Sequence, residues 1–227
     1  MATKTQRTER RADALSKARI VEAAIEILDT DGENALTFRA LSARLATGSG
    51  AIYWHVANKN DLLAATTDDV IARVMTQVVG EVAPGEAIRA IALGLFDTID
   101  EHPWVGARLS REPWQSAMLQ IFESVGQQVQ ALGVVEGEQF NAASALVNYI
   151  LGCAGQNAAN ARLAPHETDR STVLGGVAAR WTQLDPAEYP FVRQVAAQLP
   201  DHDDREQFLA GIDLILAGIE AARLATR

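Results

Sequence analysis

The chain has 227 residues, enough for one small module and one larger hydrophobic core. Its hydrophobic content is 48%, only 6% of its residues are aromatic, and no stretch alternates steadily between apolar and polar residues. This composition argues against a sheet and predicts an all-α fold of closely packed helices. The single cysteine, Cys153, excludes an internal disulfide and a cysteine-ligated zinc site, which fits a reducing compartment.

No targeting or membrane segment is expected. The first residues, MATKTQRTERR, are charged from Lys4 onward and lack the apolar core of a signal peptide. No unbroken apolar run reaches the ~18 residues of a transmembrane helix. The best candidate is interrupted by Asn148, Gln156, Asn157 and Asn160. We therefore expect a cytoplasmic protein with no membrane partner.

The charge is unevenly distributed. The formal net charge of −9 argues at first against binding DNA. Residues 1–60, however, hold 9 Lys or Arg against 7 Asp or Glu, so the acidic excess lies in the rest of the chain. Only charges within about 10 Å of the phosphates act strongly at working salt. A basic N-terminal part on an acidic body can therefore still bind DNA.

Residues 1–15 are predicted to form a flexible basic arm, because they contain several cations and almost no apolar residue. Such an arm is either a solvated tail or a contact to the minor groove or the phosphates of DNA. A first helix is predicted over residues 16–31, with Ser16 as its N-cap and Gly32 as a left-handed C-cap. Its apolar stripe consists of Ile20, Ala23, Ala24, Ile27 and Leu28.

The stretch from Thr37 to Lys59 has the pattern of a helix-turn-helix. Leu41 and Leu45 lie four residues apart and so share one face of a helix. Thr37 stands just before this helix, where its hydroxyl can cap free backbone N–H groups. Small residues then interrupt the helical pattern.

A sharp turn and a second, short helix are predicted next. Gly48 can adopt the positive φ angle of the turn, and Ser49 can cap a helix that runs to about His55. Ile52 and Val56 should face the first helix. Three consecutive rings with polar tips cannot all be buried on so short a helix, and some must meet solvent or a partner; they are Tyr53, Trp54 and His55.

At these residues the sequence resembles the TetR family of bacterial transcriptional repressors. The resemblance rests on Thr-Phe-Arg at 37–39, on Tyr-Trp-His-Val at 53–56 and on Asn58-Lys59, and it is strong from about residue 20 to 63. It implies a three-helix DNA-binding domain over residues 16–60 and a larger helical ligand-binding and dimerisation domain over 61–227. It implies that operator DNA is contacted by Thr37, Arg39, Ser49, Gly50, Ala51, Tyr53, Trp54, His55 and Lys59. Gly50 and Ala51 are smaller than the side chains common there, so fewer bases should be read directly.

Further helices are predicted along the rest of the chain. A connecting helix from Asn58 to about Val79 has Asn58 as its cap and Asp61 in its first turn. Lys59 lies at the same end, where the helix dipole disfavours a cation, so it is either a phosphate contact or a solvated lysine. The later helices are expected to end at about 102 and to span about 105–110, 112–132, 136–163, 168–185 and 203–225.

Two of these helices carry apolar faces that could meet a second copy of the chain. The faces either complete the core of one chain or, as the family resemblance implies, form a four-helix bundle in a homodimer. A single recognition helix reads only a few base pairs, so a dimer on a palindrome is needed for useful specificity. The expected interface residues are Ala143, Val147, Ile150, Ala154, Phe208, Ile212, Ile215 and Ile219.

The family resemblance also implies a pocket for a small-molecule inducer in the larger domain. Buried Trp, Asn and Arg side chains need polar partners, and a ligand could supply them. The candidates, each also explicable as core or surface, are Trp104, Arg108, Trp114, Phe122, Asn148, Tyr149, Asn157 and Trp181. Ser110 and Met75 stand where the tetracycline repressor branch has ligand-contacting histidines, so tetracycline with Mg²⁺ is not expected as the inducer. No cofactor and no metal site are expected either.

Two other classes of function were weighed. An enzyme would need a reactive constellation, and the sequence has no Ser–His–Asp arrangement, phosphate-binding glycine loop or HExxH motif. The second class is an all-α ligand-binding protein without a transcriptional role. The intact stretch from Thr37 to Lys59 argues against it.

Overall fold

The computed structural model describes residues 15–77, 82–112, 115–163 and 170–225. Every regular element in these ranges is a helix, as the all-α prediction required, and none of these helices is long and apolar enough to cross a bilayer. The predicted basic arm lies outside the described residues except for Leu15. Two compact units are present, the first within Met1–Val79 and Glu101–Ser124, the second within Gly80–Asp100 and Val125–Arg227. The predicted domain boundary after residue 60 stays a prediction.

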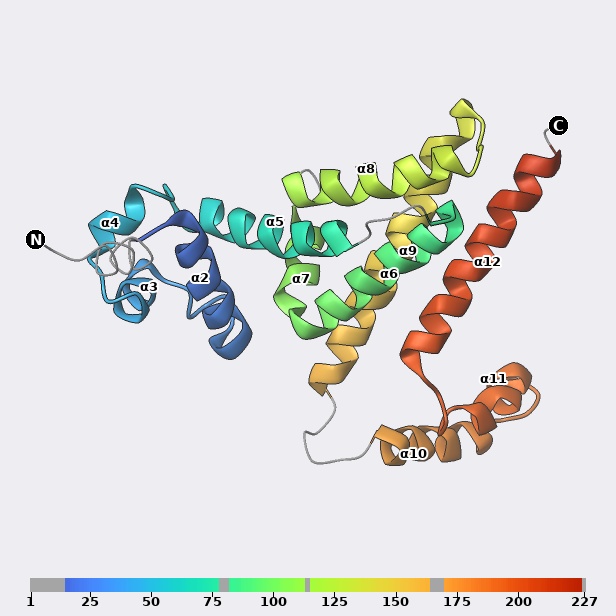
Figure 1. Cartoon of the computed structure of the whole chain (residues 1–227). Coiled ribbons are helices and arrows are strands. Elements are labelled where there is room, and N and C mark those ends of the chain that lie inside the picture. Colours follow the sequence, from blue (N-terminus) through green and yellow to red (C-terminus); the bar gives the residue numbers. More distant parts are fainter. Residues whose placement is uncertain (1–14, 78–81, 113–114, 164–169, 226–227) are drawn as a thin grey trace, which may run out of the picture. The chain divides into compact units, whose positions relative to one another are not determined.

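The first unit begins with α2 (Lys17–Asp31), which confirms the predicted first helix (Figure 1). Ser16 is its N-cap, and the hydroxyl oxygen accepts a hydrogen bond from the backbone N–H of Arg19 at 3.3 Å. The predicted apolar stripe is buried. Gly32 has the expected positive φ, 78°, but its ψ of 175° lies outside the left-handed helical region.

The two helices of the helix-turn-helix are α3 (Phe38–Arg44) and α4 (Ser49–Tyr53). The Thr37 hydroxyl caps α3 by accepting the backbone N–H of Ala40 at 3.1 Å, as predicted. The chain then reverses earlier than the glycine, because the N–H of Ala46 bonds to the carbonyl of Ala43 at 3.3 Å. Ala46 consequently has the positive φ, 49°, and the prediction that Gly48 provides it was wrong.

Gly48 instead has φ −81° and is itself the N-cap of α4. The prediction that the Ser49 side chain caps this helix was therefore also wrong, since Ser49 is already its first helical residue. The helix ends at Tyr53, two residues before the expected end.

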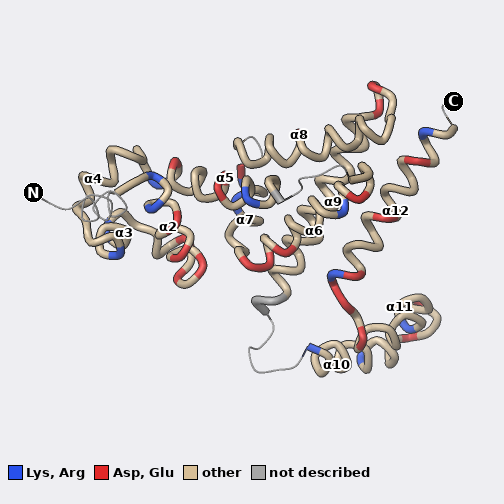
Figure 2. Tube along the Cα trace, viewed as in Figure 1, with Lys and Arg blue, Asp and Glu red and all other residues tan. Residues whose placement is uncertain are grey.

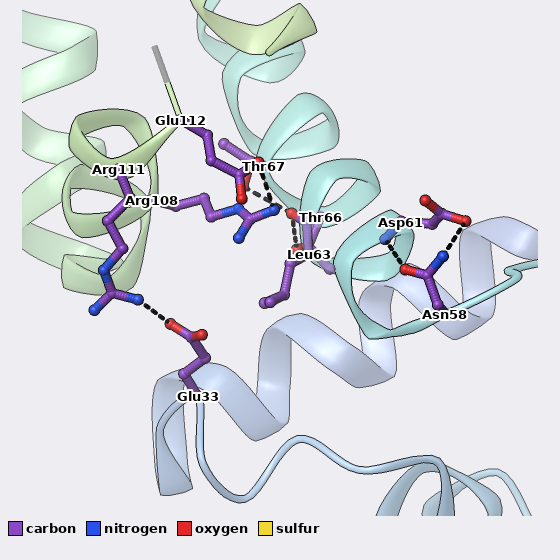
Figure 3. Close-up of polar contacts among 9 residues, drawn as sticks. All are labelled: Glu33, Asn58, Asp61, Leu63, Thr66, Thr67, Arg108, Arg111 and Glu112. Atoms are coloured by element: carbon purple, nitrogen blue, oxygen red, sulfur yellow. Dashed lines mark hydrogen bonds and ion pairs between the residues drawn. The ribbon is translucent and has the colours of Figure 1, made fainter. Parts of the chain in front are cut away.

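The connecting helix is α5 (Lys59–Gln77), and its N-cap is Asn58 as predicted. Asn58 Oδ1 accepts the N–H of Asp61 at 2.9 Å, and Asn58 Nδ2 donates to the Asp61 carboxylate at 3.1 Å (Figure 3). Further along, the buried hydroxyls of Thr66 and Thr67 both donate to the carbonyl of Leu63, each at 2.8 Å (Figure 3).

The first unit continues with α7 (Pro103–Arg111) and the beginning of α8 (Ser116–Ala131). The helix α7 is longer than the predicted 105–110, because Pro103 occupies its first turn, where the missing N–H costs no hydrogen bond. The helix α8 begins at Ser116 instead of residue 112.

The second unit contains α6 (Pro84–Glu101), the rest of α8, α9 (Glu136–Leu163), α10 (Arg170–Thr182), α11 (Pro190–Val195), the 3₁₀ helix Ala196–Gln198 and α12 (Asp204–Ala225). The long helices α9 and α12 match their predicted ranges within one residue, whereas α10 is shorter than expected. The ring of Phe208 on α12 stacks on Phe96 and on Tyr149, with centroids 4.6 and 5.7 Å apart. The Tyr149 hydroxyl also donates to the carbonyl of Phe208 at 3.1 Å.

This packing makes Gly211 intolerant of a side chain, because a Cβ there would overlap the Tyr149 hydroxyl and ring. We expect Gly211→Ala to lower the free energy of unfolding by about 1–3 kcal/mol. The control is Gly126→Ala in α8, where nothing lies within 4 Å of the added Cβ. It should be neutral or stabilising by up to about 1 kcal/mol. Chemical denaturation of both variants measures this, and equal midpoints would contradict the packing.

Candidate nucleic-acid interface and regulatory helices

The short helix α4 has one buried side and one exposed side. Ile52 is buried completely and Val56 is 4% exposed, as the sequence predicted for residues that face α3. Trp54, in contrast, is 90% exposed and Tyr53 is 54% exposed. Large rings in such positions are unusual unless they meet a partner.

The ring of Tyr53 packs on another aromatic ring of the helix-turn-helix. It stacks on Phe38 at the start of α3, with centroids 4.3 Å apart and planes at 4°. The ring plane is thus fixed by the fold, while the residue stays 54% exposed. A hydroxyl positioned in this way suits a phosphate oxygen.

The helix-turn-helix contains no acidic residue from residue 34 to residue 60, and it carries Arg39, Arg44 and Lys59. Figure 2 shows no acidic residue on α3 or α4, and the basic residues of these two helices lie on α3. Arg44 forms an ion pair with Glu26 of α2 at 2.7 Å, whereas Arg39 is exposed and no ion pair involving it is found within the described residues. The exposed face of α3 and α4 is therefore suited to a polyanion.

The structure leaves most of the predicted DNA contacts on this exposed face. Ala51 is half-buried, and the exposed ones are Thr37, Arg39, Ser49, Gly50, Tyr53, Trp54 and His55. Lys59 is different, because its ammonium donates to the carbonyl of Glu33 at 2.6 Å and the side chain is half-buried. This bond places the Lys59 ammonium beside the backbone of the DNA-binding domain, which is called the head below.

The helix α7 is bonded to the end of α2 at two places. His102 Nδ1 and Trp104 Nε1 lie 2.8 and 2.7 Å from the same oxygen of Asp29. At the other end of α7, Arg111 forms an ion pair with Glu33 at 2.9 Å (Figure 3). Trp104 is only 6% exposed and has a single N–H, so its polar group is already used and is not free for a ligand.

Arg108, between these two attachments, is a buried cation with incomplete bonding. It is 6% exposed, and its Nη2 donates to Glu112 at 2.9 Å (Figure 3). Its Nε is buried and has no hydrogen-bond partner, and the same holds for both ends of the Gln115 amide. The sequence analysis missed Gln115, which has no pattern to distinguish it from any other polar residue at a helix start.

The other predicted ligand residues are divided between the units. Phe122 is half-buried in the first unit, and Trp181 is half-buried on α10 of the second. Asn157 donates to Asp100 at 2.8 Å, and Asn148 lies exposed on α9. Trp114 lies outside the described residues.

Tyr149 is also engaged within the second unit. Burial is the main cause that raises the pKa of its hydroxyl to about 12, and the neighbouring Cys153 contributes. Since the hydroxyl donates to Phe208, Tyr149 supports the packing of α9 on α12 instead of pointing to a free site.

The predicted dimer face needs a correction. Phe208, Ile212, Ala143, Val147, Ile150 and Ala154 are all buried within the single chain, and Ile215 and Ile219 are half-buried. Helical spacing identified a buried stripe on each helix, but the stripes pack inside the unit. Of the predicted interface residues, Ile215 and Ile219 remain partly accessible to a partner chain, and the other exposed residues of α9 and α12 lie on their opposite faces.

The bonds at Asp29 predict a stability effect. Asp29→Ala would leave the N–H of Trp104 without its acceptor, so we expect the free energy of unfolding to fall by about 1–3 kcal/mol. The matched control is Asp31→Ala, two residues along the same helix and exposed, which should change it by less than about 0.5 kcal/mol. Denaturation followed by tryptophan fluorescence compares the two, and a similar loss in both would contradict the role of Asp29.

Comparison with known proteins agrees with this architecture. The family model for bacterial regulatory proteins of the tetR family matches residues 20–66, and the model for the tetracyclin repressor-like C-terminal domain matches residues 85–223. The chain is 31% identical over 148 residues to an HTH-type transcriptional regulator of Saccharopolyspora erythraea, an alignment that spans 65% of this chain and 63% of that protein. It is 27% identical over 217 residues to the HTH-type transcriptional repressor DrrR1 of Streptomyces coeruleorubidus, which covers 91% of this chain and 77% of the repressor.

A solved structure supports the same assignment. The transcriptional regulator SCO7222, a TetR protein from Streptomyces coelicolor, is 53% identical and superposes with a TM-score of 0.85 over 92% of this chain and 99% of that chain. The two family matches lie on the helix-turn-helix and on the later helices, as the sequence predicted. The chain therefore belongs to the TetR family of bacterial transcriptional regulators.

Proposed function

We propose that this protein is a homodimeric repressor that reads a palindromic DNA operator with α4 and is released from it by a small-molecule inducer. The observation that carries the proposal is that residues 34–60 contain no Asp or Glu and expose the rings of Tyr53 and Trp54, while the neighbouring Ile52 and Val56 are buried. The name of the relative DrrR1 supports repression as the output.

The exposed face of α4 suits the major groove. Its first three residues, Ser49, Gly50 and Ala51, are small, so the backbone can approach the base edges closely. Trp54, 90% exposed, offers an apolar surface to thymine methyl groups, and Tyr53 and Arg39 offer donors to phosphates. Lys59 stays a proposed phosphate contact, since one N–H of its ammonium donates to the carbonyl of Glu33 and two donors remain.

Dimerisation would use the outer faces of α9 and α12. On α12, small and apolar residues recur at a three-four spacing and are exposed: Ala210, Leu214, Ala217, Ala221 and Leu224. Leu214 is 75% exposed and Leu224 58%, which is costly for leucines in water. On α9 the outer face is made of Asn141, Ala145, Asn148, Gly152, Gln156 and Ala159, which would allow close approach of a second helix. A second copy of the chain would bury both faces.

The inducer would bind beside Arg108, whose buried Nε has no hydrogen-bond partner. The Gln115 amide, also buried and without a partner, belongs to the same unit. Arg108 lies on α7, whose two ends are bonded to Asp29 and Glu33 next to the DNA-reading helices. A ligand that shifts α7 would therefore also shift α2. To release the operator effectively, the inducer must favour the released state by several kcal/mol.

The first test is selection of bound duplexes from a random DNA pool. We expect a palindrome whose half-sites lie about 34–36 Å apart, one turn of DNA. Trp54→Ala should weaken binding to that palindrome by at least about tenfold without loss of stability, since a lost contact costs about 1–3 kcal/mol. The control, Phe191→Ala, removes a ring that is 70% exposed on α11 and should leave affinity unchanged.

Absence of any enriched sequence with folded protein at low salt would overturn the operator proposal. It would favour the alternative of an all-α ligand-binding protein without a transcriptional role.

The proposed dimer interface can be tested by introducing a charged side chain on α12. Leu214→Arg should place a cation in the proposed interface and shift the protein to monomers in analytical ultracentrifugation. Leu119→Arg in α8, where the leucine is 63% exposed, is the matched control and should leave the association state unchanged. A dimer that survives Leu214→Arg, or a wild-type monomer at micromolar concentration, would contradict this interface.

A further inference from the structure

The first unit contains a cavity that none of the predicted ligand residues lines. It is a groove that is open to solvent and has a volume of ≈ 400 Å³ among α2, α5 and α8, within the range of small-molecule sites. Its apolar walls are Ala18 and Val21 of α2 and Ala65 and Ala72 of α5. The cavity thus lies beside the contact between α2 of the DNA-binding domain and the connecting helix α5.

Asp68 lines this cavity with an incompletely bonded carboxylate. The carboxylate accepts hydrogen bonds from the backbone N–H of Ala117 and from Ser116 at the beginning of α8. Its Oδ1 is buried and has no hydrogen-bond partner. Burial raises the pKa of Asp68, while Ala117, Lys17 and Ser116 oppose that rise in decreasing order. A buried acceptor without a donor is unfavourable, so a ligand that brings a donor would relieve the cost.

Asp69, the other carboxylate of the lining, differs in this respect. It is paired with Arg73 one turn further along α5. Its charge is already compensated within the helix. Of the two, only Asp68 has a buried oxygen without a hydrogen-bond partner, and the pair provides a matched comparison.

The lining also contains a cation, Lys17, on α2. Lys17 lies in the first turn of α2, where the helix dipole disfavours a positive charge, and its side chain is exposed. No ion pair within the described residues engages it, although its charge acts on Asp68. The lining therefore combines the Asp68 carboxylate, the Lys17 ammonium that attracts it, and an apolar surface.

We propose that this cavity binds a small zwitterion, an α-amino acid with an apolar side chain. The ammonium group donates to Asp68 Oδ1, the carboxylate meets Lys17, and the side chain lies against the alanines and Val21. Gln120 of α8 adds an amide to the same lining. Neither a simple amine nor a simple acid uses both charges, so the pattern selects a molecule that carries both.

Binding here links α2 to α5 and so restrains the DNA-binding head on its connecting helix. Neither Arg108 nor Gln115, the residues assigned to the inducer site, lines this cavity. The binding step does not depend on DNA, on dimerisation or on the proposed inducer.

The experiment is calorimetric titration of the full chain, without DNA, with leucine, valine and methionine. We expect at least one of them to bind. Two analogues of leucine, 4-methylpentanoate and 3-methylbutylamine, each lack one charge and should bind at least tenfold more weakly. Asp68→Asn and Lys17→Met should each weaken binding at least tenfold, whereas Asp69→Asn should retain wild-type affinity.

Three results would overturn the proposal. The first is no binding of any of the three amino acids to folded wild-type protein. The second is binding that is equally weakened by Asp68→Asn and Asp69→Asn. The third is unchanged affinity in Lys17→Met, which remains informative if Asp68→Asn fails to fold. Because no DNA is present, these results stand apart from those of the operator selection.

Discussion

One carboxylate oxygen, Oδ1 of Asp29, joins the end of α2 to the beginning of α7. It lies within hydrogen-bond distance of both His102 and the buried Trp104, two residues that flank the proline at the helix start. The side of α2 that carries Ile20 and Leu28 is buried, so the helix cannot move without disturbing the core of the head. A displacement of α7 would therefore be passed to the head as a rigid body, because packed interiors deform little.

Within the part of the chain that the structure describes, the buried polar side-chain atoms without a hydrogen-bond partner all belong to the first unit. They are atoms of Asp68, Arg108 and Gln115. Folding normally satisfies such groups, since each unpaired one costs about 1–3 kcal/mol. Stability alone would not favour three such residues near the helices that carry the head. Their retention is explained if ligands complete the bonding, with an acceptor at Arg108 and a donor at Asp68.

The helices could be predicted from sequence because local rules set them. Ser16, Thr37 and Asn58 cap their helices through bonds within three residues, and such bonds need no tertiary information. The prediction for the turn before α4 was wrong because glycine is only statistically preferred at a positive φ. The fold placed the positive φ at Ala46, although Gly48 was available. The exposed rings of α4 were predicted because so short a helix cannot bury them all.

The surface that a partner chain would contact on α9 and α12 could not be derived in this way. A stripe such as Ala143 to Ala154 shows that one face is buried, but spacing does not tell whether the other side of the contact is the same chain or a partner. The burial of Ile212 and the exposure of Leu214, two residues apart, settle which face of α12 is used inside the unit. An exposed leucine stripe remains on α12, and a helix with apolar residues on both sides needs a second surface to cover it. Since most of the predicted stripe is buried within the unit and Leu214 and Leu224 are exposed, the outer face of α12 is favoured as the dimer contact.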